Sequence, residues 1–166
     1  MGHLDFVKPF LERAGTVHFG RVLLKPGKPT TFATVSRGDG GEGTPHTLVF
    51  GLPGNPVSAN VTFHLFAVPA LRLMSGRRNA DHAQVPVELT RDVRYDPNRP
   101  EFHRATVVSR RGRLVATSTG VQRSSRLLSM RDANALLLVP QDSATIAAGS
   151  TIGAMLLGDI VNEDDE

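Results

Sequence analysis

The sequence predicts an α/β segment followed by a small β-barrel or β-sandwich. In the first half, stretches with helical apolar spacing alternate with short segments rich in β-branched residues, which is typical of α/β folds. From residue 85 onward, short segments of alternating apolar residues follow one another between turn signals, which is typical of small all-β domains. The polar stretch at residues 77–81 separates the two halves.

The first half contains two expected helices and three expected strands. Apolar residues at helical spacing predict a short helix over residues 5–13, which Gly15 ends. The expected strands lie at residues 16–24, 30–35 and 47–52. A long helix is expected over residues 57–73, with Ser58 as its N-cap and with a kink or break at Pro69. Its apolar residues occupy more than one face, so we expect it to be well buried.

The second half contains five expected strands, with segments at residues 85–89, 102–108, 114–118, 135–139 and 151–157. Residues rich in Pro, Gly, Asp and Asn separate them and predict tight turns. The acidic residues 163–166 predict a solvated tail.

Composition narrows the class of protein. The chain has 166 residues and 40% hydrophobic residues, which argues against global disorder. A net charge of +3, 5% aromatic residues and no Trp disfavour nucleic-acid binding. The lack of Cys excludes disulfides and thiolate metal sites and fits the cytosol. No uninterrupted apolar run of about 18 residues occurs, so no membrane span is expected.

Two motifs in the first half suit an anion. Residues 25–29 (KPGKP) place the ammonium groups of Lys25 and Lys28 on a stiff turn, which can clamp an oxyanion; the alternative is a charged surface turn. Residues 51–58 (GLPGNPVS) run from a strand into a helix, where free backbone N–H groups and the Ser58 hydroxyl can bind an anion. The alternative here is an ordinary turn with a Ser cap.

Two motifs in the second half are less specific. Residues 99–104 (RPEFHR) could also be an edge strand with solvated charges. Residues 124–134 interleave hydroxyls with two arginines, which suits a tetrahedral oxyanion. The alternative is a short amphipathic helix with Leu127, Leu128 and Met130 packed inward.

Other chemistries find no support in the sequence. The six histidines show no close pair at metal-ligand spacing, and His64 is interpreted as a core residue. Neither a Gly-x-Ser-x-Gly motif nor a nearby Ser/His/Asp grouping is present, so nucleophilic hydrolysis is not predicted.

Taken in order, four stretches resemble the molybdenum insertase family, which includes bacterial MoeA proteins, plant insertase E domains and the E domain of gephyrin. The stretches are residues 19–33, residues 51–59 with 68–71, residues 100–104 and residues 118–130. The resemblance implies the C-terminal half of a three-layer α/β, molybdopterin-binding-like domain at residues 1–77 and a β-barrel domain at residues 78–166. Residues 1–5 look like the tail of a family loop, so we expect further domains upstream and an incomplete parallel sheet.

The resemblance also implies a function. The family's molybdopterin molybdenumtransferases insert molybdate into adenylylated molybdopterin and release AMP with the help of Mg²⁺. Carried over by motif, the molybdate site takes Lys25, Lys28, Pro29 and Ser58 from the α/β side and Arg104 and Ser129 from the barrel side. Asp5 matches a loop aspartate implicated in catalysis and in binding Mg²⁺.

The expected partners also follow from the family. They are a second copy of the full-length protein in a homodimer and a molybdopterin adenylyltransferase, either separate or fused. Two alternatives remain open. One is a non-catalytic, gephyrin-like scaffold that binds peptides and dimerises, and the other is a general phosphate-ligand binding module.

Overall fold

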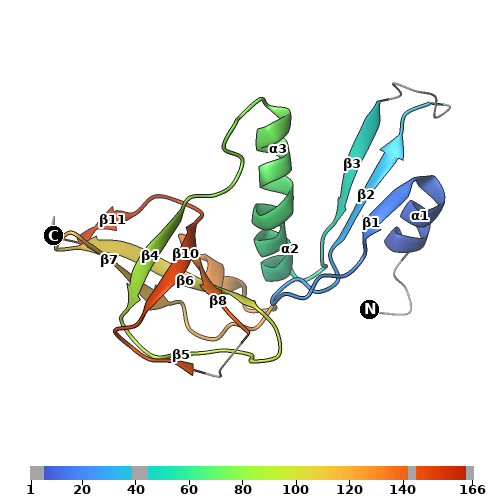
Figure 1. The fold of residues 1–166 in the computed structure, drawn as a ribbon. Coiled ribbons are helices and arrows are strands. Elements are labelled where there is room, and N and C mark those ends of the chain that lie inside the picture. The colour runs from blue at the N-terminus through green and yellow to red at the C-terminus, as the bar shows by residue number, and fades with distance from the viewer. Residues whose placement is uncertain (1–5, 39–44, 142–144, 164–166) are drawn as a thin grey trace.

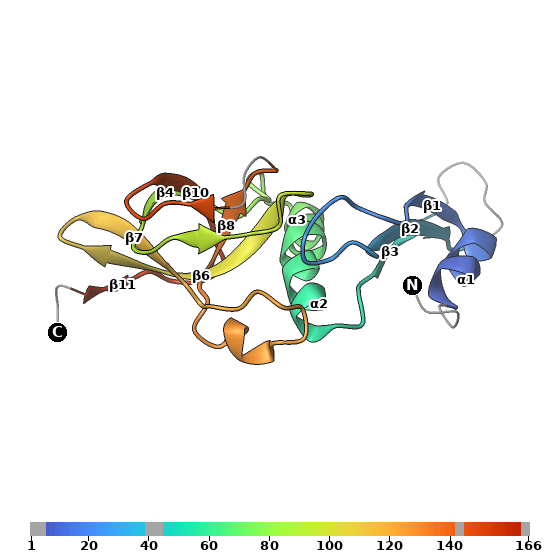
Figure 2. The same ribbon diagram turned by 90° about the horizontal axis from the view of Figure 1, so that it is seen from below.

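The computed structural model describes residues 6–38, 45–141 and 145–163. It has an N-terminal part made of a small sheet and a helix, a C-terminal β-barrel, and a long helix that stands between them (Figure 1). Seen from below, the same three bodies form a row from one end of the molecule to the other (Figure 2). The described N- and C-terminal ends lie at opposite ends of this row.

The N-terminal part consists of α1 (Val7–Ala14) and the strands β1 (Thr16–Phe19), β2 (Thr31–Ser36) and β3 (His46–Gly51). The strands lie in the order β1-β2-β3, and both pairings are antiparallel. The expectation of a parallel sheet is therefore wrong for these strands. The connections, residues 20–30 and 37–45, are too short for the crossover helix that parallel neighbours would need. The first strand also ends at Phe19, earlier than expected, because the chain then leaves the sheet for the turn at residues 25–29.

The long helix is continuous from Pro56 to Met74 and contains α2 (Pro56–Thr62), a π-helical turn η1 (Phe63–Ala67) and α3 (Val68–Met74). Pro69 does not split it. The π turn lies just before the proline, where the Val68 N–H bonds the Phe63 carbonyl. Such a turn accommodates the hydrogen bond that a proline cannot donate.

Two other expectations about this helix are wrong. Its N-cap is Asn55, because Pro56 occupies the first helical position, where its fixed φ is favourable. Ser58 therefore lies within the first turn of the helix, where its side chain is buried. The helix is also buried only in its first part. Its buried residues lie in α2 and η1, and α3, all of which the structure describes, contains none. Leu71 and Met74 are 55% and 71% exposed.

The length and apolar composition of the segment Pro56–Met74 match those of a membrane-crossing helix. The core helices of soluble proteins have the same properties, so the match does not by itself indicate a membrane span.

The described residues of the C-terminal part form eight strands: β4 (Gln84–Leu89), β5 (Val93–Arg94), β6 (Glu101–Arg110), β7 (Arg113–Ser118), β8 (Ala135–Val139), β9 (Thr145–Ile146), β10 (Thr151–Leu156) and β11 (Val161–Asn162). Five of them follow the order β6-β7-β4-β10-β8, and β8 pairs again with β6. This second pairing closes the ring, so the domain is a five-stranded barrel and not a sandwich. Closure removes the open sheet edges.

The barrel core is apolar and almost completely buried. Its buried residues include Val87, Leu89, Val107, Leu137 and Ala154. Alternate residues of β6 point into this core, which brings polar residues at the start of the same strand to one mouth of the barrel. That mouth faces the long helix and the turn at residues 25–29.

Candidate functional site

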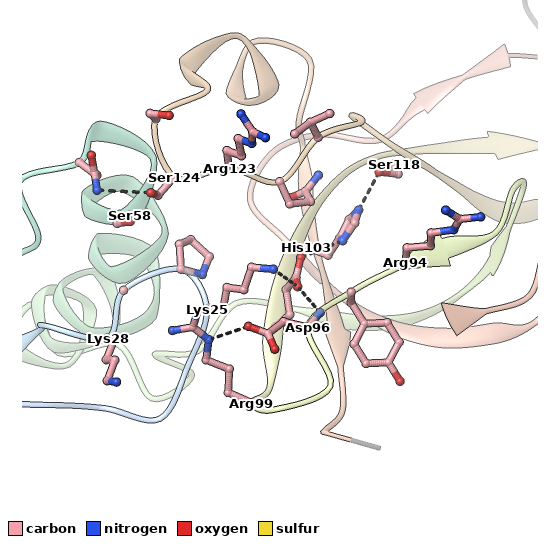
Figure 3. Close-up of a pocket in the computed structure, with 18 of the residues that line it drawn as sticks. Lys25, Lys28, Ser58, Arg94, Asp96, Arg99, His103, Ser118, Arg123 and Ser124 are labelled. Carbon is pink, nitrogen blue, oxygen red and sulfur yellow. Dashed lines mark hydrogen bonds and ion pairs between the residues drawn. The ribbon is translucent and has the colours of Figure 1, made fainter. Parts of the chain in front are cut away.

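A cavity of about 1070 Å³ lies where the N-terminal part, the start of the long helix and the barrel mouth meet (Figure 3). The turn contributes residues 25–29, and the helix start contributes Asn55 and Ser58. The barrel contributes residues 92–96, Arg99, Glu101, His103, Ser118 and residues 120–125. Four residues predicted from sequence, Lys25, Lys28, Pro29 and Ser58, therefore line one cavity together.

The turn at residues 25–29 is fixed on both sides. Gly27 has φ +121°, and an added Cβ would overlap the Thr62 methyl group and lie 2.8 Å from Leu24 Cδ1. Only glycine fits this conformation without strain. The buried Thr30 hydroxyl donates to the Gly27 carbonyl at 2.6 Å. The turn is thus packed directly against the long helix.

The same turn is joined to the barrel through its backbone. The Lys25 N–H donates to the Pro100 carbonyl at 2.9 Å, and the Phe102 N–H donates to the Lys25 carbonyl at 2.8 Å. These two bonds form an isolated parallel bridge between Lys25 and Glu101. The position of Lys25 relative to the barrel mouth is therefore set by main-chain contacts.

The side chains of the two lysines of the turn point in different directions. Lys25 Nζ lies 2.9 Å from Glu101 Oε2, in an ion pair whose carboxylate is 1% exposed. Lys28 is exposed, and in Figure 3 its side chain extends away from Lys25. The oxyanion clamp expected from the sequence thus has one lysine already bound to a carboxylate and one directed elsewhere.

The start of the long helix forms the wall opposite the barrel mouth. Ser58 is only 4% exposed, yet it borders the cavity. Asn55 Nδ2 donates to Ser124 Oγ at 3.3 Å and so connects the helix start to the barrel loop. First-turn N–H groups have no partner within a helix, and a helix start carries partial positive charge. This wall therefore favours an anionic ligand.

Glu101 is the most connected polar group of the site. Its Oε1 lies 3.1 Å from His103 Nδ1, and its Oε2 also accepts the Asp96 N–H at 3.2 Å. Burial alone would raise the pKa of Glu101, but the hydrogen bonds from His103, Lys25 and the Asp96 backbone outweigh burial and lower that pKa. The group is therefore a buried carboxylate, and the alternative of an edge strand with solvated charges is wrong for residues 99–104.

His103 continues the chain of contacts. Its Nε2 lies 2.7 Å from Ser118 Oγ, and the His103 side chain is 3% exposed. The sequence shows no nearby Ser/His/Asp grouping, but in three dimensions Ser118, His103 and Glu101 lie together. The hairpin turn at residues 111–112 sets a register that pairs Ala105 with Ser118, so Ser118 lies diagonal to His103 on the same face. The Glu-x-His pattern puts Glu101 and His103 on one face of a strand. Combined with that register, it would have predicted the contact with Ser118.

Arg104 and Ser129 lie behind the cavity wall and not in its lining. Arg104 is fully buried, and its Nε donates to Ser129 Oγ at 2.8 Å. Its Nη1 is buried without a hydrogen-bond partner among the described residues. Burial lowers the pKa of Arg104 despite the attraction of Glu101. A buried guanidinium with a free N–H donor is the kind of group that an anion stabilises.

The segment around Ser129 forms a short 3-10 helix, η2 (Leu127–Met130). Leu127 and Leu128 are 60% and 73% exposed, while Ser129 is buried. The alternative of an amphipathic helix with both leucines packed inward is therefore wrong.

The predicted metal residue, Asp5, lies outside the described residues. Within residues 6–38, 45–141 and 145–163, no group of three or more His, Cys, Asp and Glu residues is arranged to hold a metal ion. The carboxylates at the cavity are otherwise engaged: Glu101 as above, Asp96 with Asn98 and Arg99, and Asp92 with the Ala148 N–H. These described residues do not fit a Mg²⁺ ion.

Two histidines that are far apart in the sequence contact each other outside the cavity. His64 Nδ1 on the long helix is 3.3 Å from His82 Nε2 in the connection to β4. Burial is the largest cause that lowers the pKa of each ring, and the positive charge of Arg72 adds to it. The interpretation of His64 as a core residue missed this contact between the helix and the barrel.

Comparison with known proteins agrees with the architecture. A family model for the MoeA C-terminal region (domain IV) matches residues 86–157, and one for a probable molybdopterin binding domain matches residues 1–73. The chain is 47% identical to "Gephyrin" of Dictyostelium discoideum over 98% of its own length and 25% of that protein. It is 46% identical to "Molybdenum cofactor synthesis protein cinnamon" of Drosophila melanogaster over 95% of its length and 26% of that protein.

Bacterial and archaeal proteins are similar at lower identity. "Molybdopterin molybdenumtransferase" of Bacillus subtilis is 30% identical over 95% of the chain and 35% of that protein. A crystal structure of the MoeA protein of Pyrococcus horikoshii superposes with a TM-score of 0.66 at 28% identity, covering 92% of this chain and 34% of that one. The chain thus spans about a quarter to a third of the length of these relatives. With its two parts matching two consecutive family models, the chain belongs to the molybdenum insertase family.

Proposed function

We propose that this chain supplies the molybdate-binding part of a molybdopterin molybdenumtransferase, which inserts molybdate into adenylylated molybdopterin and releases AMP. The observation that carries the proposal is the shared cavity: Lys25, Lys28, Pro29 and Ser58 line it together. The name of the Bacillus subtilis relative, molybdopterin molybdenumtransferase, supports the reaction class.

The chemistry of the cavity suits a tetrahedral dianion. Molybdate needs several hydrogen-bond donors and positive charge, and it needs no nucleophile from the protein. The Ser58 hydroxyl and the helix start supply donors on one wall. Lys28 adds a cation if its exposed side chain turns toward that wall. Lys25 adds a second cation if it exchanges Glu101 for the ligand. The protein's task is then to hold the oxyanion beside the pterin sulfurs and to offset their mutual repulsion.

Arg104 and Ser129 enter the proposal as groups behind the wall. Arg104 Nη1 is a buried donor without a hydrogen-bond partner among the described residues, which suits an anion. Arg104 lies one contact away from the cavity, because its Nη2 donates to the carbonyl of the cavity-lining Arg123 at 3.4 Å.

The remaining parts of the proposal rest on the family resemblance. Mg²⁺ would bind through Asp5. The full-length protein would form a homodimer, which the exposed apolar residues Phe6, Phe10, Leu71 and Met74 support. A molybdopterin adenylyltransferase would supply the substrate, and the lack of Cys fits the cytosol.

Calorimetric titration of the chain with molybdate tests the proposal. We expect Lys28→Ala to weaken binding by about tenfold, the loss of one charge-assisted hydrogen bond, and Lys25→Ala with Lys28→Ala to abolish it. The matched control is Lys8→Ala, which removes the remaining lysine, one that pairs with Glu12 on α1. Unchanged affinity in the double variant would refute the molybdate site. Phosphate competing as well as molybdate would favour the phosphate-module alternative, and peptide binding without molybdate affinity would favour the scaffold.

A further inference from the structure

We propose that Ser118 is a reactive serine, activated by His103 and Glu101, that attacks the phosphorus of an anionic phosphoryl ester or phosphoanhydride bound in the cavity. The three residues come from two neighbouring strands of the barrel and meet at its mouth. Figure 3 shows Ser118 and His103 joined at the cavity wall.

The contacts have the order that an activated nucleophile requires. A hydroxyl lies within hydrogen-bond reach of a base, and a third group orients the base. Here Ser118 Oγ is 2.7 Å from His103 Nε2, and His103 Nδ1 is 3.1 Å from Glu101 Oε1. Both distances fall within the range expected of a nucleophile and its base. The base and the orienting group are 3% and 2% exposed, whereas Ser118 borders the cavity.

The direction of each hydrogen bond follows from the carboxylate. The Glu101 carboxylate can only accept, so the hydrogen between it and His103 lies on Nδ1, and a His103 that acts as a base has its Nε2 free to accept. Nε2 is then the acceptor, and the Ser118 hydroxyl donates to it. The Gly120 N–H donates to Ser118 Oγ at 3.1 Å, which fixes the orientation of the hydroxyl. The remaining lone pair of Oγ is available for attack.

A purely structural role would explain less. A buried Glu–His pair can simply satisfy its own polar groups inside a barrel. Glu101, however, already has two other donors, from Lys25 and the Asp96 backbone. The second nitrogen of His103 contacts the cavity-lining Ser118 hydroxyl. That hydroxyl already has the Gly120 N–H as a partner, so it does not need His103 for its own satisfaction.

The charge of the cavity determines the class of substrate. Two of its cations are paired, Lys25 with Glu101 and Arg99 with Asp96. The lining also contains Lys28, Arg94 and Arg123 against a single further carboxylate, Asp92. An excess of lysine and arginine suits phosphoryl oxygens.

The proposed step is balanced with water as the only co-reactant. Ser118 Oγ bonds to phosphorus, the bond from phosphorus to the leaving oxygen breaks, and the hydroxyl proton passes to His103 Nε2 and then to the leaving oxygen. Water then attacks phosphorus, the bond to Oγ breaks, and a proton of that water returns through His103 to Ser118. The net reaction is hydrolysis of one ester or anhydride bond.

The adenylyl phosphoanhydride of the proposed substrate belongs to this class, but the inference does not depend on molybdate binding. A test that uses neither molybdate nor pterin keeps the two ideas separate. The chain is treated at pH 8 with a fluorophosphonate probe, which forms a bond to an activated serine and releases fluoride. Peptide mass spectrometry then measures the labelling rate at each serine.

Two other serines in the same cavity are internal controls: Ser124, which contacts Asn55, and Ser125. We expect Ser118 to react about 100-fold faster than either, the effect of one positioned general base. His103→Gln should lower the Ser118 rate by a similar factor while circular dichroism shows a folded chain, and Ser118→Ala should abolish the label.

Equal labelling of the three serines, or none in the folded wild-type chain, would overturn the proposal. If His103→Gln does not fold, the comparison within the wild-type chain decides alone. Loss of molybdate binding with rapid Ser118 labelling would refute only the proposed insertion function.

Discussion

Removal of the Lys25 ammonium group should destabilise the fold by an amount that the structure sets. Lys25→Ala leaves the Glu101 carboxylate, 1% exposed, without its cation. Breaking a buried ion pair from one side costs about 3–5 kcal/mol when the other charge has no further partner. Glu101 keeps two donors, from His103 and the Asp96 N–H, and the Lys25 side chain is itself 27% exposed. We therefore expect a lower cost, about 2–3 kcal/mol.

Urea denaturation followed by circular dichroism measures this cost at pH 7. The double variant Lys25→Ala, Glu101→Gln separates the charge from packing, because the amide needs no cation. If the buried charge causes the loss, the double variant should lose less unfolding free energy than the two single variants lose in sum, by about 1 kcal/mol or more. A Lys25→Ala chain within about 0.5 kcal/mol of wild type would refute the reasoning.

Three further predictions follow from other parts of the fold. Gly27→Ala should cost about 2–4 kcal/mol in urea denaturation, because the added methyl meets Thr62 and φ is positive; an unchanged midpoint would contradict the packing at the turn. The lowered pKa values of His64 and His82 mean that the unfolded chain binds more protons below pH 6.5, so thermal stability should fall as pH drops from 7 toward 5. His82→Gln should flatten that slope, and an equal slope in wild type and variant would disprove the assignment. Leu137→Ala in the barrel core should cost about 2–5 kcal/mol by denaturation, and a loss below about 1 kcal/mol would show that the core tolerates a cavity there.

Local signals predicted the elements of this fold well where turn chemistry or periodicity was strong. The helix at the N-terminus, the long helix and the barrel strands at residues 102–108 and 135–139 lie where apolar spacing placed them. The predicted strand direction of the N-terminal sheet was wrong, because pairing depends on how the chain connects strands and not on their composition. The N-cap was misplaced because Pro56 begins the helix, which gives Asn55 the capping position.

The site was predictable in part for the same reason. Lys25, Lys28, Pro29 and Ser58 belong to compact motifs, and the cavity collects all four. The ion pair to Glu101 joins positions 76 residues apart and depends on the bridge between the turn and β6. No local pattern encodes such a contact. The group at Ser118 could have been found only from a hairpin register, which requires the strand pairing to be known.

The bridge between the turn and β6 has a mechanical consequence. On that side of the cavity, two main-chain hydrogen bonds and an ion pair hold the N-terminal part to the barrel. The long helix is held to the barrel separately, through the apolar cluster of Val61, Leu136 and Met155 and through the contact between Asn55 and Ser124. Because the turn and the helix are each tied to the barrel, we expect the walls of the cavity to keep their spacing when a ligand enters or leaves.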